Sequence, residues 1–532
     1  MKKIFRFYLI TSVFLLLASS CSKKVDDAYL NPNAPTKVPP EQLLPAVIYN
    51  IAQDLQRDNR YLSLYIQNFS YRTGSYTAER MGYFSGSDAM GDIWRNHYWL
   101  LGQNVLRMID WAAEEQKWDY VGVGYAIMAW SWLTLTDYHG DVILKEAFNT
   151  NLLTFKYDTQ EEVYAYVREL CHTAISYLER TDGASSQANL ALGDGYFYNG
   201  DASKWKKFAY GVLARSFHHL TNKSNYNADS VIAYCDKSLA DASDDATVKW
   251  ANSGKNDEAS FFGPFRGNMA NFRQSQFISD LLQGANPAFN GVDDPRKWYY
   301  LRTSSNGSMK GLPLAAGETA LAAADRPDNF WGGTTAVPFP PNDLNAKYVF
   351  RDNGEFPIMT ASEIQFMKAE AAYKKNDKTL ALAAYKKGIE YSFDMLMTRF
   401  NQNIPSGNEI TATIKNNFLA NPAVVPAAAS SLTLAQIMLQ KYISLWGFNN
   451  TETWVDLRRY HYTDIDPVTT EQVYTNFAPP TGSLLFPDNN GKPAYRVRPR
   501  YNSEYVWNIE ELRRIGATDP DYHTVECWFS KP

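Results

Sequence analysis

The side chains of this chain best suited to chemistry are aromatic rings in one loop. Tyr71, Tyr76, Tyr83 and Phe84 lie with Arg80 in a segment rich in glycine and serine between two predicted helices. Flat rings with polar groups at their edges suit sugar rings and peptide side chains, which present C–H faces rimmed by hydrogen-bonding groups. We therefore predict that these five residues contact a ligand. Ordinary packing of the loop is the competing interpretation.

A second group of aromatic residues comes from other segments. Trp298, Phe330 and Trp331 lie between residues 251 and 356, where glycine, proline, asparagine and serine are frequent. The glycines that follow Trp331 would let a backbone approach a ligand closely, and long loops of this kind are commonly functional. Trp94 opens a predicted helix. We include all four as candidate ligand contacts, with loop or core packing as the alternative, which is favoured for Trp94.

Residue types that could catalyse a reaction or hold a metal ion form no recognisable pattern. The seven histidines lack the His-Glu-x-x-His zinc spacing, and His218 and His219 are adjacent, which directs them to different helix faces. Neither a phosphate-binding glycine loop nor a Gly-x-Ser-x-Gly elbow occurs. We interpret Arg458, Arg459 and Asp456 as part of a buried or half-buried charge network, with direct contact to a ligand or a protein partner as the alternative. No enzymatic activity, no cofactor and no metal site is expected.

The first residues predict export and a lipid anchor. Basic residues at positions 2, 3 and 6 precede a mainly apolar run from Phe7 to Leu17, which ends in Ala18-Ser19-Ser20-Cys21. The run is too short to span a bilayer, which needs about 20 apolar residues. Small residues before a cysteine are typical of a lipobox, so we expect cleavage before Cys21 and acylation of its thiol. The alternatives are an ordinary secretory signal with an incidental cysteine, or retention at the inner membrane.

Composition narrows the class of protein further. The formal net charge is −5 and the 52 lysines and arginines are spread along the chain, whereas nucleic-acid binding needs a concentrated basic face. With Cys21 acylated, Cys171, Cys235 and Cys527 remain, an odd number without close spacing, so no disulfide framework is predicted. The 35 tyrosines, 28 phenylalanines and 14 tryptophans supply both a core and surfaces for a ligand.

Helices dominate the elements that must position these residues. Apolar residues at three- and four-residue spacing predict helices over residues 41–57, 94–111, 159–179, 228–240 and from an N-cap at Asp201 or Ser203 to Leu220. Residues 120–135 are apolar all round and predict a helix in the middle of a large core. Residues 361–393 predict two helices joined at Asn376-Asp377, similar to a tetratricopeptide (TPR) hairpin.

Several separate stretches together resemble the SusD/RagB family. In chain order they are Asn31 to Thr36, Asp137 to Val142, Gly200 to Arg215, Asp294 to Arg296, Pro357 to Ala371, Gln440 to Arg459 and Arg498 to Tyr501 with Glu504 and Asn508. Their order matches the family as well as their content, over essentially the whole mature chain. His139 and Ile143 depart from the family's commoner residues.

The resemblance implies a mostly α fold, a single large domain in which TPR-like helical hairpins form an α-α superhelix beneath a loop-rich ligand-binding face. The implied organisation is a signal peptide at 1–20, a lipidated tether and extended lead-in at 21–40, and a SusD-like domain at 41–532 with a loop-rich insertion at 251–356. The implied function is capture of a nutrient, an oligosaccharide or a peptide, at the extracellular side of the outer membrane, and delivery to a SusC-like TonB-dependent barrel. The alternative is a TPR-type surface scaffold that binds protein or peptide partners only.

Overall fold

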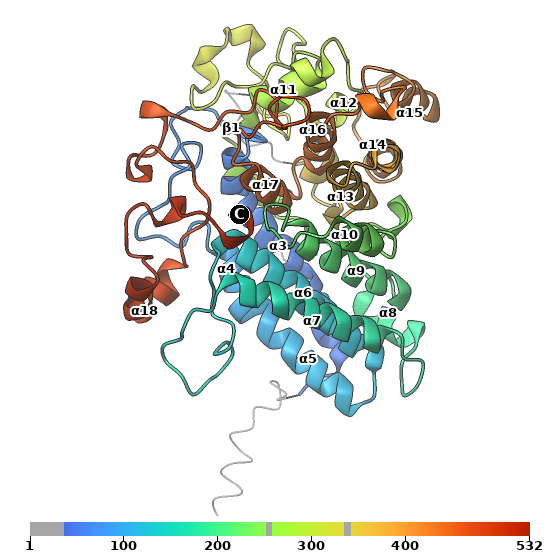
Figure 1. Cartoon of the computed structure of the whole chain (residues 1–532), viewed down its shortest axis with the longest axis vertical. Coiled ribbons are helices and arrows are strands. Elements are labelled where there is room, and N and C mark those ends of the chain that lie inside the picture. Colours follow the sequence, from blue (N-terminus) through green and yellow to red (C-terminus); the bar gives the residue numbers. More distant parts are fainter. Residues whose placement is uncertain (1–36, 252–257, 335–341) are drawn as a thin grey trace, which may run out of the picture.

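The structure is a computed structural model of the 532-residue chain, and it describes residues 37–251, 258–334 and 342–532. The predicted signal peptide, Cys21 and the lead-in motif at Asn31 to Thr36 lie outside the described residues. Figure 1 shows helices packed on one another at the centre and right, with long loops gathered along the left side.

Helices make up the framework of the fold. Their bounds are α3 Pro40–Tyr65, α4 Asp92–Arg95, α5 Gly102–Glu114, α6 Trp118–His139, α7 Gln160–Leu178, α8 Gln187–Asp194, α9 Ala202–His218, α10 Ala228–Cys235, α11 Gln276–Leu282, α12 Lys297–Tyr300, α13 Ala361–Lys374, α14 Lys378–Arg399, α15 Ala412–Leu419, α16 Leu434–Leu445, α17 Asn450–Arg459 and α18 Ile509–Arg514, with π-helical turns η1 at Asn96–Leu101 and η12 at Tyr501–Tyr505. Within the described residues, consecutive helices pack on each other in hairpins, most extensively α6 with α7, α13 with α14, α5 with α6 and α9 with α10. The predicted mostly α fold with TPR-like hairpins is confirmed.

Short strands add two small antiparallel ladders. Strand β1 (Phe69–Tyr71) pairs with β3 (Phe272–Gln274), so that Phe69 lies opposite Gln274 and Tyr71 opposite Phe272. Strand β2 (Ala246–Val248) pairs with β4 (Phe356–Met359), with an irregularity between Ala246 and Thr247. The first ladder fixes the start of the aromatic loop against the middle of the chain.

Local sequence signals explain where several helices begin. Thr159 and Glu162 form a reciprocal capping box at the start of α7, and the Asp201 side chain accepts hydrogen bonds from the backbone N–H groups of Ser203 and Lys204 at the start of α9. The two helices predicted within 361–393 are confirmed as α13 and α14. Other boundaries differ, because α3 continues to Tyr65 and the helix predicted over 94–111 is divided by the π turn η1.

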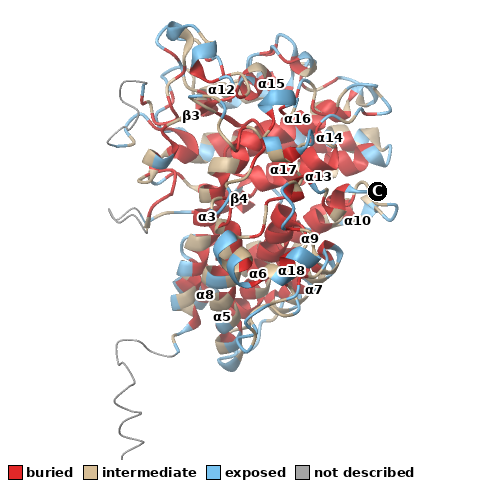
Figure 2. Cartoon of the chain, turned by 90° about the vertical axis from the view of Figure 1, so that its left-hand side faces the viewer, coloured by how far each residue is buried: buried red, intermediate tan, exposed pale blue. Residues whose placement is uncertain are grey.

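Helix α6 lies in the middle of the core, as its sequence predicts. Gly122 and Gly124 let neighbouring helices approach, since an added Cβ would lie 2.6 Å from Leu178 Cγ and 2.5 Å from Ile109 Cγ1 respectively. Nearly all of its residues are buried (Figure 2). Among the described helices, none combines the length and apolar content that crossing a membrane requires.

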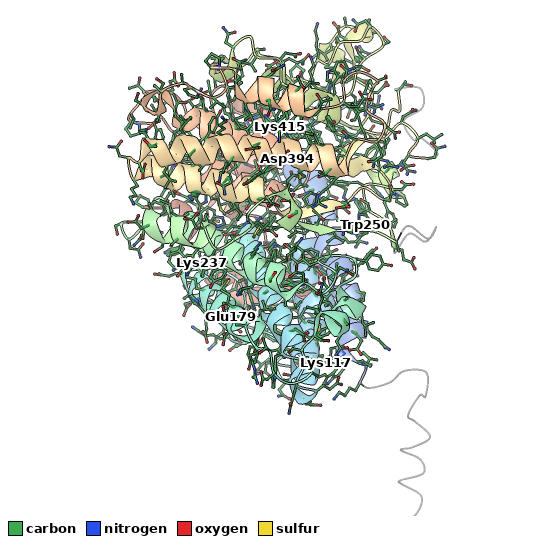
Figure 3. All side chains as sticks on the ribbon, turned by 90° about the vertical axis from the view of Figure 1, so that its right-hand side faces the viewer. Lys117, Glu179, Lys237, Trp250, Asp394 and Lys415 are labelled. Atoms are coloured by element: carbon green, nitrogen blue, oxygen red, sulfur yellow. The ribbon has the colours of Figure 1, made fainter. Side chains whose placement is uncertain are left out.

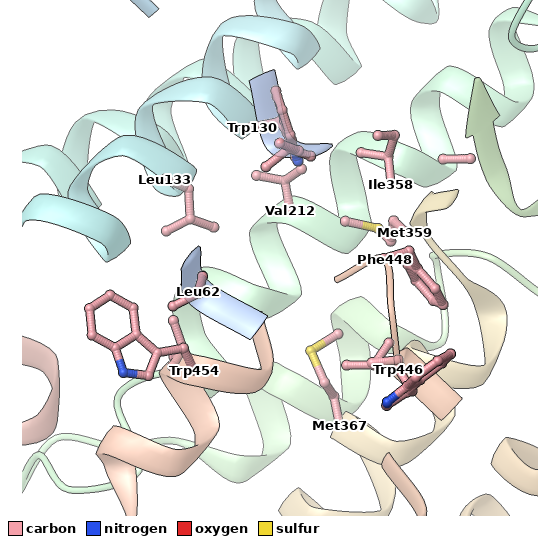
Figure 4. Close-up of a cluster of buried hydrophobic side chains, with 14 of the residues drawn as sticks. Leu62, Trp130, Leu133, Val212, Ile358, Met359, Met367, Trp446, Phe448 and Trp454 are labelled. Carbon is pink, nitrogen blue, oxygen red and sulfur yellow. The ribbon is translucent and has the colours of Figure 1, made fainter. Parts of the chain in front are cut away.

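Large side chains fill the centre where helices from both halves of the chain meet. Trp446 and Trp454 are fully buried, and Figure 4 shows them with Leu62 of α3 and Met367 of α13. At the outer side of the superhelix, Lys415 Nζ pairs with Asp394 Oδ1 at 2.6 Å across α14 and α15 (Figure 3). The helical framework is therefore closely packed at its centre and carries half-buried ion pairs nearer its surface.

A buried charge network joins α13, α16 and α17. The guanidinium of Arg459 bonds to Glu370 at 2.7 Å and to Asp456, while Lys441 Nζ lies 2.9 Å from Glu452 Oε1 and 2.8 Å from Asp456 Oδ2. All of these side chains are almost completely buried. The prediction of a network around Arg459 and Asp456 is confirmed, and removing one partner would leave an uncompensated buried charge.

Arg458, the third residue assigned to that network, has a different role. Its guanidinium lies over the Trp454 ring at 3.8 Å and donates to the Tyr495 carbonyl at 2.8 Å. It therefore ties α17 to the C-terminal segment rather than to a carboxylate.

Candidate functional site

The aromatic loop and the C-terminal segment meet on one face, although some 400 residues separate them. Arg80 Nη2 donates to the Leu485 carbonyl at 2.9 Å, and the backbone N–H of Phe486 donates to the Arg80 carbonyl at 2.9 Å. Gly82 is required here, because a Cβ at this position would lie 2.4 Å from the Phe486 ring. The blue loop and the red C-terminal segment lie together at the left of Figure 1, and Figure 2 looks onto this face.

Four half-buried rings form a row along the loop. Tyr71 and Tyr76 stack with centroids 4.1 Å apart and planes 11° apart, Tyr76 contacts Phe84 at 5.6 Å, and Phe84 contacts Tyr61 of α3 at 5.3 Å. Each ring keeps part of its surface exposed. We call Tyr61, Tyr71, Tyr76 and Phe84 the aromatic row. Its rings are pre-ordered by one another, which lowers the entropy lost when a ligand stacks on them.

A pocket of about 210 Å³ adjoins the aromatic row at Phe84. The loop contributes Tyr83 and the exposed Ser85-Gly86-Ser87 turn, in which Gly86 has a φ of +67° that favours glycine. The C-terminal segment contributes Arg496, Arg498, Arg500, Tyr501, Tyr505 and His523. Tyr501 and Tyr505 stack at 5.8 Å, and Arg498 lies over the Tyr83 ring at 4.4 Å. We call this cavity the arginine pocket.

A buried carboxyl group lies beneath the loop. Glu79 is fully buried, and its Oε1 accepts a hydrogen bond from the Tyr71 backbone N–H at 3.3 Å. Burial raises the pKa of Glu79 to about 7, although hydrogen bonds from the backbone of Ala315 and Tyr71 act in the opposite direction. The loop that carries the rings is thus held by a group that is partly ionised at neutral pH.

The structure brings together five of the nine predicted ligand contacts. Tyr71, Tyr76 and Phe84 belong to the aromatic row and Tyr83 to the arginine pocket, where its hydroxyl donates to Asp488 at 2.8 Å. Arg80 is beside them, but its guanidinium donates to the Ser483 and Leu485 carbonyls, so it positions the loop.

The other four predicted contacts lie elsewhere. Phe330 and Trp331 are only 1% and 0% exposed, because Phe330 stacks on Phe350 at 4.4 Å and Trp331 Nε1 donates to the Phe262 and Phe350 carbonyls at 2.7 and 2.8 Å. Neither ring can stack on a ligand. The glycines that follow Trp331 belong to a packed loop and do not open a ligand site there.

Trp94 and Trp298 also lie apart from the row. Trp94 is 3% exposed and packs among Tyr98, His139 and Tyr157, in line with the core packing favoured for it. Trp298 is half-buried on α12, with Lys297 Nζ 5.4 Å from its ring centroid, and it does not line the arginine pocket.

Sequence reasoning missed the contribution of the C-terminal segment. Arg498 and Tyr501 belong to a stretch used only for the family resemblance, and Tyr505 and Arg496 were not singled out. The available signal was the Arg-x-Arg-x-Arg-Tyr run from Arg496 to Tyr501, which places alternating guanidinium groups beside a ring. Nothing in it shows which distant loop it meets.

The buried histidines are the group in the described residues closest to a metal-binding arrangement. Ligand atoms of His218, His219 and Glu452 lie within 4.8 Å of one another. Each histidine already bonds a carboxylate, His218 to Glu370 at 2.7 Å and His219 to Glu452 at 2.9 Å. Although burial opposes the charge, Glu452 and Asp137 raise the pKa of His219 to about 9. Both ring nitrogens of His219 face carboxylates, of Asp137 and Glu452, so this histidine fits an ion-pair network, whereas burial lowers the pKa of His218 to about 4.

Comparison with known proteins agrees with this architecture. Residues 32–482 match the SusD-like family described as "Starch-binding associating with outer membrane". Among solved structures, a SusD/RagB family protein from Bacteroides thetaiotaomicron is 22% identical with a TM-score of 0.63, covering 93% of this chain and 99% of that one. A SusD homologue from Bacteroides fragilis is 17% identical with a TM-score of 0.68, covering 93% and 100%.

The description of a third solved structure names the ligand of that protein. It is a chitin-binding SusD homologue from Flavobacterium johnsoniae, 19% identical with a TM-score of 0.61, covering 92% of this chain and 96% of that one. Among curated proteins, none matches the chain. Since the family match extends over residues 32–482, most of the sequence, the chain belongs to the SusD-like family.

Proposed function

We propose that this chain is a surface-exposed lipoprotein of the outer membrane that captures an oligosaccharide and delivers it to a SusC-like TonB-dependent barrel. The observation that carries the proposal is the aromatic row beside the arginine pocket, on a face built from loops. Half-buried aromatic rings suit the C–H faces of sugars, and the family description and the chitin-binding relative favour glycans over peptides.

The geometry predicts weak capture. If three rings each contribute about 1 kcal/mol beyond a few hydrogen bonds, the dissociation constant falls between about millimolar and micromolar. Weak binding suits a two-part importer, because association with the barrel raises the effective concentration of the ligand.

Calorimetry with a panel of oligosaccharides and peptides tests the capture function. Tyr76→Ala removes the ring that contacts both Tyr71 and Phe84, so we expect about tenfold weaker glycan binding. Tyr234→Ala is the matched control, since Tyr234 and Tyr210 also stack as half-buried rings, at 6.5 Å and 22°, but on α9 and α10. Binding of peptides with no response to any glycan would favour the TPR-type scaffold instead.

The anchor and the partner need separate experiments. Labelled palmitate should attach to the wild-type protein and not to Cys21→Ser, because acyl chains on that thiol would hold the mature protein on the membrane. Delivery predicts that the protein co-purifies with a TonB-dependent barrel from detergent-solubilised membranes. A protein free in the periplasm, or one that never co-purifies with a barrel, would contradict the import role.

A further inference from the structure

The arginine pocket differs from an ordinary sugar site in the charge of its wall. Arg496, Arg498 and Arg500 all line it, and no aspartate or glutamate does. The chain as a whole carries a formal net charge of −5, so this local excess of positive charge does not follow from bulk composition.

Arg500 is the one of the three with a carboxylate partner. It forms an ion pair with Asp88, whose other hydrogen bonds come from Asn502, with the backbone N–H at 2.9 Å and Nδ2 at 2.7 Å. This pair is close to neutral and fixes the loop to the C-terminal segment. It leaves the other two guanidinium groups to set the charge of the pocket.

Arg496 and Arg498 are bonded to neutral groups. Arg496 donates to the Val525 and Glu526 carbonyls at 2.8 and 2.9 Å and to the Tyr522 hydroxyl at 3.3 Å. Arg498 donates to the Ala517, Asp519 and Pro520 carbonyls at 2.7, 2.8 and 3.0 Å and to the Tyr505 hydroxyl at 3.0 Å. Over residues 37–251, 258–334 and 342–532, neither has a carboxylate within ion-pair distance.

These contacts orient the guanidinium groups without cancelling their charge. Asp488, in the C-terminal segment, accepts the Tyr83 hydroxyl and does not line the pocket. Four of the five N–H groups of Arg498 are used by the acceptors above, so one donor is left for a ligand. Pre-oriented arginines in a partly enclosed cavity attract an oxyanion more strongly than the same groups on an open surface, because less water screens them.

Aromatic surface lies beside this charge. Tyr501 is 36% exposed, and its ring stacks on Tyr505, which also lines the pocket. Ser85 and Ser87 also line the pocket and are exposed. A sugar ring could rest on Tyr501 while a charged substituent points inward to Arg498.

We propose that the arginine pocket binds an acidic sugar, whose carboxylate or sulfate group faces Arg498 while its ring packs against Tyr501. The inference rests on the proposed glycan capture and specifies the class of glycan. Neutral sugars would use the aromatic row alone, whereas an acidic oligosaccharide would use both parts of the face.

Calorimetry with four probes tests the inference: trigalacturonic acid for the carboxylate, a sulfated galactan oligosaccharide for the sulfate, and maltotriose and chitotriose as neutral sugars. We expect at least one acidic probe to bind about tenfold tighter than both neutral ones in about 20 mM salt. In about 500 mM salt the advantage should shrink several-fold, since screening shortens the range of the interaction. The stronger of the two acidic probes then distinguishes carboxylate from sulfate.

Variants assign the preference to the pocket. Arg498→Gln should remove most of the advantage of the acidic probe over the neutral ones, about tenfold, and Arg498→Lys should restore part of that advantage by returning the charge. Arg168→Gln is the matched control, because Arg168 also lies over a ring, Phe217 at 3.9 Å, and donates to a backbone carbonyl, on a remote helix.

The outcomes separate this inference from the proposed function. Equal binding of acidic and neutral probes, or an acidic preference that survives in folded Arg498→Gln, overturns the acidic-sugar assignment and leaves glycan capture intact. Failure of all four probes to bind overturns both. Should Arg498→Gln not fold, the salt dependence of the wild-type preference and the Arg498→Lys variant still decide between them.

Discussion

Replacing the buried carboxyl group beneath the aromatic row should stabilise the protein in a pH-dependent way. Glu79 is fully buried, and its pKa is raised by burial from 4.5 to about 7. The raised pKa means that the folded state holds its proton more tightly than the unfolded state. The wild-type protein therefore loses stability as the pH rises from about 4.5 to about 7.

The size of the effect follows from the shift. A shift of about 2.5 pH units corresponds to about 3 kcal/mol, since each unit is worth about 1.4 kcal/mol. Glu79→Gln removes the ionisation and keeps an acceptor for the Tyr71 N–H. We expect the variant to be more stable than the wild type by up to about 3 kcal/mol at pH 8, and by close to nothing at pH 4.5.

Urea denaturation of both proteins at several pH values measures this difference. Glu169→Gln serves as the control, because Glu169 is exposed on α7 and its replacement should change the free energy of unfolding by less than about 0.5 kcal/mol. A Glu79→Gln protein that is less stable at pH 8, or a difference that is the same at pH 4.5 and pH 8, would refute the reasoning. Glycan affinity measured in parallel shows whether Glu79 must be ionised for the loop to bind the glycan.

Three further changes test the core, the charge network and the loop contact. Trp331→Ala should lower the free energy of unfolding by about 3–5 kcal/mol in urea, because it leaves a cavity and two unpaired carbonyls, while the folded fraction binds glycan normally. His219 is protonated in the folded state, so the wild type should lose up to about 3 kcal/mol as the pH rises from about 6.5 to about 9, and that loss should be absent in His219→Gln. Gly82→Ala should cost about 1–3 kcal/mol in thermal or chemical unfolding and weaken glycan binding, because its methyl group would displace Phe486; unchanged affinity would contradict the role given to this contact.

Most of the helical framework can be predicted from the sequence because apolar residues recur at helical spacing within each segment. The helices of the hairpin at 361–393 and the cap at Asp201 follow from spacing and from one side chain. The C-terminal end of α3 does not follow from local spacing, because the polar residues after Arg57 are buried against partners that are distant in the sequence. Asp58 accepts the Ile93 backbone N–H at 2.9 Å, and Asn59 Nδ2 donates to the Phe448 carbonyl at 3.0 Å. No local pattern shows that a polar residue has such a partner.

Distant partners also decide which of the predicted aromatic ligand contacts lie at the site and which are buried elsewhere. Tyr76 and Trp331 both lie near glycines in loops, so composition gives them equal standing as ligand contacts. Trp331 is fully buried, and the carbonyls of Phe262 and Phe350 accept its indole N–H, whereas Tyr76 is half-buried and its ring contacts the half-buried rings of Tyr71 and Phe84. A buried N–H group needs a hydrogen-bond acceptor. For the Trp331 indole, the two acceptors lie 69 and 19 residues away in the sequence. Whether an aromatic residue packs in the core or is available to a ligand thus depends on the segment that folds over it. For the arginine pocket, that segment is the C-terminal one, about 400 residues from the loop.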